Sequence, residues 1–286
     1  MNHKEIAEEI FNLKENIILV YAFNGTGKTR LSVAYKDISK EKNDGNHSGV
    51  YYNAFSEDLF VWDNDEPNDN DNILLNVNSS SLNQFHGSLT EELVYDKLAP
   101  YKPKYDFYFN TYENPEKGIE SISFYIKGDD KTRIKISRGE ERIFVWCFFL
   151  TLFEGEGWAD EQNTHFFIDD PVSSLDDHNI FITAATVFDL IEEQFEDRKI
   201  VITSHHFGFL TILSNWLSKG EKASKFRNRD KSKKFKEYIM KNDSESLSLI
   251  KPNNGVFLYH LRLLQILDEA HKNEIYAYHF ALLRQV

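Results

Sequence analysis

Four short segments of the chain carry side chains suited to holding phosphate groups or a divalent cation. In chain order they are YAFNGTGKT (21–29), KISRGEE (135–141), FFIDDPVSSLD (166–176) and VITSHH (201–206). Glycines followed by lysine and threonine are typical of a loop that cradles phosphates, and aspartates after an apolar strand are typical of Mg²⁺ ligands and proton acceptors. Any one of these segments is a weak signal, but the four in this order indicate one site for a nucleoside triphosphate.

The glycine-rich loop lies between an apolar run at 17–21, which predicts a buried strand, and a helical pattern that begins at Leu31. At such a junction glycines let backbone N–H groups approach phosphate oxygens, and the positive end of the following helix faces the anion. We expect Lys28 to reach the β- and γ-phosphates and the Thr29 hydroxyl to ligate Mg²⁺. The expected nucleotide-binding residues of this loop are Asn24, Gly25, Thr26, Gly27, Lys28 and Thr29.

Two adjacent aspartates follow the apolar run 166–168. Because open α/β sheets bind ligands at the carboxyl ends of their strands, both carboxylates should face the phosphate loop. We expect Asp169 to ligate Mg²⁺ together with Thr29, with Asp170 as a second carboxylate beside it. If the two acids stood alone, a solvated strand end would be a reasonable explanation for them.

The order of the four segments resembles that of ABC-type ATPases. In that class the serine of the second segment closes on the γ-phosphate held by a partner subunit. The resemblance therefore implies a homodimer or higher homo-oligomer and assigns Ser137 and Gly139 to nucleotide binding. Arg138 stands where the common motif LSGGQ has a glycine. Asp170 stands where most ABC proteins carry the glutamate that positions the attacking water, so the resemblance implies a catalytic role for Asp170. Because aspartate is one methylene shorter than glutamate, we expect slow turnover. Ser137 by itself would fit a capping box at the start of the helix expected over 143–153 equally well.

The fourth segment places two histidines after an apolar strand. We expect His205 to be the catalytic residue that senses the γ-phosphate, because it follows Ser204 as in ABC strands, and His206 is the alternative. Asp176 belongs to SSLD, which resembles the D-loop, and is expected beside the nucleotide at the dimer contact. Gln84 is one of several polar residues that could be the glutamine sensing Mg²⁺.

The wording YAFNGTGKTRLS (21–32), YNAFSEDLFVWDND (52–65) and IDDPVSSLD (168–176) resembles the N-terminal ATPase domain of PrrC-type anticodon nucleases. These are related to the RloC nucleases and, more distantly, to SMC-like ATPases. The resemblance implies an antiphage protein whose C-terminal ribonuclease of the HEPN class cleaves a tRNA anticodon loop. It also implies a type I restriction–modification enzyme as inhibitor, hydrolysis of ATP or GTP with Mg²⁺, and a response to dTTP.

The fold expected is an α/β ABC-type P-loop domain over residues 1–254, with a mixed sheet and a smaller helical lobe carrying Ser137. Residues 255–286 read as the start of a C-terminal helical, HEPN-like nuclease region that is truncated, so tRNA cleavage is expected of a longer parent. The sequence has no sustained heptad pattern, so we expect this chain to lack the coiled-coil arm of SMC-like proteins. The alternative hypothesis is an ATPase subunit of a Septu-type antiphage system that acts with a separate DNA nuclease.

The composition indicates a cytoplasmic protein with no membrane association. The chain has a net charge of -13, one cysteine, and polar residues that interrupt any apolar leader at its start. The segment Lys219–Lys241 differs, because it carries ten Lys or Arg against three Asp or Glu. This segment could contact a phosphate backbone, or it could be an ordinary solvated face.

Overall fold

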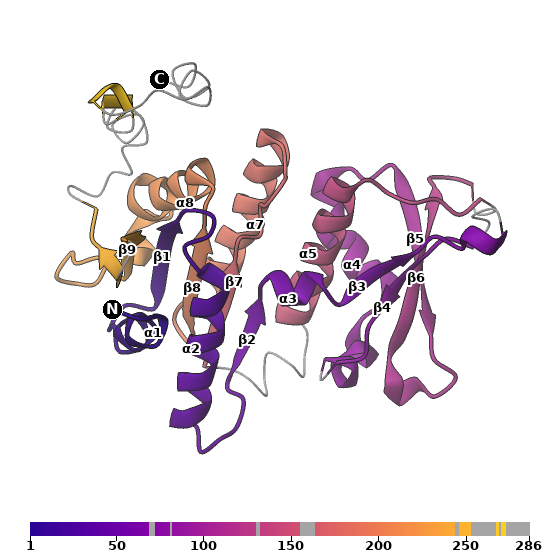
Figure 1. The fold of residues 1–286 in the computed structure, drawn as a ribbon, viewed down its shortest axis with the longest axis horizontal. Coiled ribbons are helices and arrows are strands. Elements are labelled where there is room, and N and C mark those ends of the chain that lie inside the picture. Colours follow the sequence, from indigo (N-terminus) through magenta and orange to yellow (C-terminus); the bar gives the residue numbers. More distant parts are fainter. Residues whose placement is uncertain are drawn as a thin grey trace.

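The computed structural model describes residues 1–68, 72–80, 82–129, 132–154, 164–243, 246–252, 267–268 and 270–272. Most of the expected nuclease region at 255–286 lies outside the described residues, so its assignment stays a prediction. Two lobes make up the described part, each built around its own sheet (Figure 1).

The larger lobe contains a six-stranded sheet with the strand order β10-β9-β1-β8-β7-β2. Its strands are β1 (Ile17–Ala22), β2 (Gly49–Tyr52), β7 (His165–Asp169), β8 (Lys199–Ser204), β9 (Phe235–Asp243) and β10 (Ser246–Ile250). Every neighbouring pair is parallel except β9 and β10, which are antiparallel. The expected α/β fold with a mixed sheet is therefore confirmed.

Helices cover both faces of this sheet. Successive residues of β1 point to opposite faces, so they pack against different helices. Ile18 and Val20 pack in one apolar cluster with α1 (His3–Phe11) and α2 (Lys28–Lys42). Ile17 and Leu19 belong to the other cluster, which includes residues of α7 (Asp177–Gln194) and α8 (Phe207–Lys219). All six residues of β1 are buried, as expected of a central strand with an unbroken apolar sequence.

The smaller lobe is more than the helical unit expected from the sequence, since it contains an antiparallel sheet of order β3-β4-β6-β5. Its elements are β3 (Phe60–Asp63), β4 (Leu74–Val77), α4 (Glu91–Leu98), β5 (Tyr105–Thr111), β6 (Ile119–Ile126) and α5 (Arg138–Glu154), and a short helix α3 (Ala54–Glu57) leads into it from β2. Strand β4 has a polar sequence around it, and its alternate residues Leu75 and Val77 are buried. Beyond β6 the chain turns back and forms an isolated bridge between Tyr125 and Arg133.

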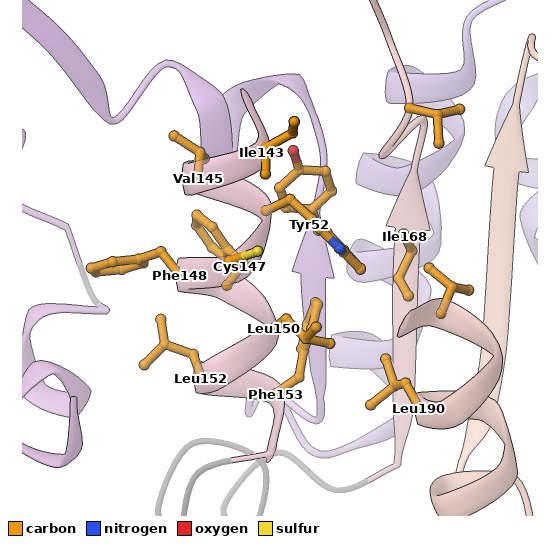
Figure 2. Packing of buried hydrophobic residues seen from close by; sticks show 14 of the residues in the cluster. Tyr52, Ile143, Val145, Cys147, Phe148, Leu150, Leu152, Phe153, Ile168 and Leu190 are labelled. Atoms are coloured by element: carbon orange, nitrogen blue, oxygen red, sulfur yellow. The ribbon is translucent and has the colours of Figure 1, made fainter. Parts of the chain in front are cut away.

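Helix α5 lies between the two sheets and joins their cores. Every residue from Ile143 to Phe153 is buried, so this helix is apolar on all sides. Phe144 packs edge-on against Phe107 and Phe124 of the antiparallel sheet, with ring centroids 4.9 Å apart in each case. Toward the larger lobe, Trp146 lies 5.1 Å from Tyr52, and other side chains of α5 point to Ile168 and Leu190 (Figure 2).

Candidate functional site

The glycine-rich loop connects the end of β1 to the start of α2. Gly25 and Gly27 have φ angles of 81° and 93°, in the left-handed region that other residues avoid. A Cβ at Gly27 would also collide with the His3 imidazole. The loop conformation therefore depends on glycine at both positions.

Lys28 is buried at the start of α2, and its ammonium group lies over the loop. Its Nζ donates to Asn24 Oδ1 at 3.2 Å and to the Ala22 carbonyl at 3.5 Å. The same Nζ lies 3.6 Å from the Asp170 carboxylate. This arrangement places a positive charge between the backbone of the loop and the acid that follows β7, which is where the terminal phosphates of a nucleotide would lie.

Thr29 and Asp169 contact each other across 140 residues of sequence. The Thr29 hydroxyl donates to Asp169 Oδ2 at 2.9 Å, and the Thr203 hydroxyl donates to Asp169 Oδ1 at 2.6 Å. Burial raises the pKa of Asp169, and the hydrogen bonds from Thr203 and Thr29 oppose that rise. A hydroxyl and a carboxylate at this separation are hard oxygen donors of the kind that Mg²⁺ takes together with phosphate oxygens, so the residues fit that ion.

Asp170 has a left-handed backbone with φ of 57°, which turns its carboxylate toward the end of β8. Oδ1 accepts from the Ser204 hydroxyl at 2.7 Å and from the His205 N–H at 3.4 Å, while Oδ2 accepts from His205 Nδ1. Burial raises the pKa of Asp170, but the bonds from His205 and Ser204 and the charge of Lys28 outweigh it and leave the pKa lowered. The carboxylate is therefore ionised and can accept a proton.

Ser137, Gly139 and Asp176 lie apart from this group. Ser137 is exposed immediately before α5 and forms a capping box with Glu140, whose Oε2 accepts from the Ser137 hydroxyl at 2.7 Å and its N–H at 2.9 Å. Among the residues that the structure describes, no atom outside the two adjacent residues and the backbone of the helix lies within 4 Å of the position that a Cβ of Gly139 would take. Asp176 caps α7 by accepting from the Asn179 N–H at 2.9 Å. The capping box named above as an alternative is thus present, and it leaves the surface around Ser137 open.

A cavity of about 530 Å³ opens over the phosphate loop. Its walls combine residues expected from the sequence with others that sequence reasoning missed. The lining residues are His3, Asn24, Gly25, Thr26, Gly27, Lys28, Thr29, Arg30, Ala54, Glu57, Arg142, Asp169, Asp170, Ser173 and Asn242. Ala54 and Glu57 lie in the segment 52–65, whose sequence resembles the anticodon nucleases, and that resemblance was a signal that could have found them. The sequence around His3, Arg142 and Asn242 gave no signal of a place in the cavity.

The remaining sequence candidates have local roles. His206, the alternative to His205, caps α8 by accepting from the Phe209 N–H at 3.1 Å. Gln84 belongs to the 3-10 helix Asn83–Ser88, but its side chain lies outside the described residues.

The lysines of the basic segment are largely paired with acids. Lys222 and Lys225 both contact Glu192, while Lys233 lies 3.5 Å from Glu237, Lys234 lies 3.5 Å from Glu196, and Lys236 lies 3.1 Å from Glu15. This pairing favours the interpretation of Lys219–Lys241 as a solvated face.

The fold and the cavity define a P-loop ATPase, and comparison with known proteins agrees. A sequence model of the family described as AAA domain matches residues 90–276. The chain therefore belongs to the AAA-domain ATPases, whose domain binds nucleotide. A relative from Escherichia coli, "Anticodon nuclease", is 33% identical over 320 residues, which cover 99% of this chain and 76% of the relative. The chain belongs to the anticodon nuclease family, as the resemblance implied.

Solved structures with similar folds are more remote. The SmcHead bound to the C-winged helix domain of ScpA has a TM-score of 0.43 and 11% identity, and covers 86% of this chain and 92% of that one. The archaeal ribosome recycling factor aABCE1 in complex with aP1 has a TM-score of 0.43 and 14% identity, over 85% of this chain and 39% of that one. Among the described residues, no helix has the length and apolar character needed to cross a membrane.

Proposed function

We propose that this chain binds ATP or GTP with Mg²⁺ in the cavity over the phosphate loop, hydrolyses it, and thereby regulates an anticodon nuclease. The observation that carries the proposal is the convergence of two groups on one cavity: Thr29 with Asp169, and Lys28 with Asp170. His205 is not in the cavity lining and contacts the Asp170 carboxylate from behind it. The first group offers oxygen ligands to a cation. The second combines a cation for phosphate with an ionised carboxylate.

In the proposed mechanism the loop holds the phosphates and Asp170 prepares the water. Backbone N–H groups of Asn24 to Thr29 bind the β- and γ-phosphates, and Lys28 neutralises their charge. When bound, Mg²⁺ supplies charge neutralisation at the transferring phosphoryl group, with Thr29 and Asp169 as its protein ligands.

Asp170 orients a water molecule whose oxygen forms the new bond to the γ-phosphorus as the bond to the β-phosphate oxygen breaks. The water proton passes to the Asp170 carboxylate and then to phosphate. His205 holds that carboxylate in place through its Nδ1 and backbone N–H.

A second copy of the chain is part of this proposal. Ser137 and Gly139 lie at an exposed helix start and are absent from the lining of the cavity, so they are available to close on the nucleotide of a partner. Asp176 lies at the exposed start of α7, where it would meet the partner. The helix dipole of α5 and its first N–H groups suit an incoming γ-phosphate. We therefore propose a homodimer with two composite sites.

The regulated activity is proposed by relationship to the family. Residues 1–254 would be the NTPase domain and 255–286 the beginning of the helical nuclease region, with tRNA as substrate. A type I restriction–modification enzyme as inhibitor and dTTP as a second nucleotide signal belong to the same proposal. The "Anticodon nuclease" relative favours this function over a subunit that works with a separate DNA nuclease.

The test expresses the full-length protein in cells and sequences the cleaved RNA. Wild type should yield fragments cut within an anticodon loop, and Lys28→Ala should not. In vitro, the wild-type chain should release phosphate from ATP or GTP in a Mg²⁺-dependent reaction. Absence of both nucleotide hydrolysis and RNA cleavage in the full-length wild type would refute the function.

A further inference from the structure

Arg142 is a cation of the cavity lining that has no role in the scheme above. Arg142 lies on α5, just past the exposed serine, yet its side chain reaches the cavity of its own chain. Its Nη1 donates to the Ser173 carbonyl at 2.7 Å and lies 3.4 Å from Ser174 Oγ. Its Nη2 lies 3.7 Å from Glu57 Oε2. Arg142 thus connects helix α5 to the turn that follows Asp170.

The contact between Arg142 and Glu57 is a loose one. At 3.7 Å it is longer than a charge-assisted hydrogen bond of about 2.7–2.9 Å. Burial raises the pKa of Glu57, with the charge of Arg142 opposing that rise, so the carboxylate is poorly stabilised where it lies. The Tyr52 hydroxyl also donates to Glu57 Oε1, at 3.2 Å. A phosphate oxygen with a higher charge would be a better partner for the guanidinium.

The sheet order tells which end of a nucleotide Arg142 faces. The phosphate loop follows β1, with β8, β7 and β2 on one side and β9 on the other. Arg142 shares its part of the lining with Glu57, Asp170 and Ser173, which follow β2 and β7. Asn242 lies on β9, across the loop. Since Asp169 and Asp170 mark the γ-phosphate end, Arg142 lies at that end.

The segment Tyr52–Asp65, so far without a function, holds the start of α5 in this position. Trp62 Nε1 donates to Glu141 Oε2 at 2.8 Å. Lys135 Nζ donates to Asn64 Oδ1 at 2.8 Å and lies over the Trp62 ring. Together with Glu57, these contacts anchor both sides of the exposed serine, so the Arg142 side chain starts from a defined place.

We propose that Arg142 binds the terminal phosphate of a triphosphate held by the same chain, exchanging its contact with Glu57 for that phosphate. The inference rests on the proposed function. It adds a residue that binds the γ-phosphate of the nucleotide held by its own chain, and so distinguishes a triphosphate from a diphosphate. Because Arg142 also holds the Ser173 carbonyl, its movement shifts the turn 173–174 that leads to Asp176. Binding of a γ-phosphate thereby changes the conformation of the dimer-facing surface before a partner binds.

The experiment measures Kd for a nonhydrolysable triphosphate and for the corresponding diphosphate, with Mg²⁺, on full-length protein. Arg142→Gln should weaken triphosphate binding by about tenfold to hundredfold, the range for a hydrogen bond to a charged group. Diphosphate binding should stay within about twofold. Glu57→Gln should change the ratio in the opposite direction, since it releases the guanidinium. Arg229→Gln, at an exposed position away from the cavity, is the matched control.

The outcomes separate this inference from the function beneath it. Equal loss of both nucleotides in Arg142→Gln, or no change in either, overturns the role of Arg142 while Lys28→Ala still abolishes binding. If the wild type binds neither nucleotide, the proposed function fails and the inference fails with it. Arg142→Lys, which keeps a charge, should retain part of the triphosphate preference and guards against misfolding as the explanation.

Discussion

Asp170→Asn is the most informative change in the proposed site, because it replaces one oxygen of a carboxylate with nitrogen and little else. The amide oxygen can still accept from the Ser204 hydroxyl, which lies 2.7 Å from Oδ1. The new NH₂ group can donate to a neutral His205 Nδ1 in place of the present contact. The contact with Lys28, at 3.6 Å, loses its charge. The variant should therefore fold and keep its loop geometry.

The expected size of the effect follows from these contacts. An amide cannot take a proton from water, and a positioned general base contributes about 10²–10⁴-fold to a rate. That factor corresponds to about 3–5 kcal/mol of transition-state stabilisation. Binding should be preserved or strengthened, since Lys28 no longer shares its charge with the side chain at position 170. The variant should accumulate as a dimer loaded with nucleotide.

Three measurements on the same preparation test this reasoning. Phosphate release gives kcat, a nonhydrolysable analogue gives Kd, and light scattering gives the mass with and without Mg²⁺–nucleotide. Asp177→Asn, at an exposed acid outside the cavity, is the matched control and should behave as wild type. Hydrolysis by Asp170→Asn at the wild-type rate would show that this carboxylate has no catalytic role.

Lys28→Ala should abolish nucleotide binding, measured by calorimetry, because it removes the buried cation over the loop. Ser137→Arg should leave binding by each chain intact and prevent the nucleotide-dependent dimer seen by light scattering, because it places bulk and charge on the exposed helix start. Acid should destabilise the fold, since burial lowers the pKa of His86 to about 4 and of His165 to about 3, both below the unfolded value of 6.5. Stability is then complete above about pH 6.5 and falls by about 1.4 kcal/mol per pH unit for each histidine below it, so urea unfolding at pH 5 should show about 4 kcal/mol less than at pH 7.5.

Each of these expectations has a result that contradicts it. Nucleotide bound equally well by Lys28→Ala would place the phosphates elsewhere. A dimer formed normally by Ser137→Arg would separate the exposed serine from assembly. An unfolding free energy that is flat between pH 7.5 and 5 would show that the two histidines accept protons in the folded state.

The sequence was most informative where the chemistry is local. The loop from Asn24 to Thr29 and the two aspartates after β7 each depend on one strand and the residues next to it, so a short pattern predicts both the element and the side chains that it presents. The contact between His205 and Asp170 required in addition that β7 and β8 be neighbours. The sequence named both residues and assigned His205 to the γ-phosphate, which stays a prediction, but it did not foresee the contact between His205 and the Asp170 carboxylate.

The parts that sequence reasoning missed are those assembled by distant pairing. The antiparallel sheet pairs β4 with β6 across a connection that includes α4 and β5, and no short pattern reports such a partner. Arg142 read as one more charged residue at the start of an apolar helix, because only the packing of α5 brings it to the loop. The same holds for Asn242 at the edge of the cavity.

The burial of α5 has a mechanical consequence. From Ile143 to Phe153, about three turns of helix α5 are buried, with side chains packed on both sides of the helix (Figure 2). Ser137, just before the helix, is exposed. A helix that is packed on all sides over this length resists bending. A force applied at its first turn is therefore transmitted to the elements that pack against it. Binding of a partner at Ser137 would then rotate the whole smaller lobe, which contains the antiparallel sheet. The smaller lobe would then move as one unit with α5. The displacement would be largest at the end of that lobe farthest from the phosphate loop, and a regulated enzyme bound there would sense it.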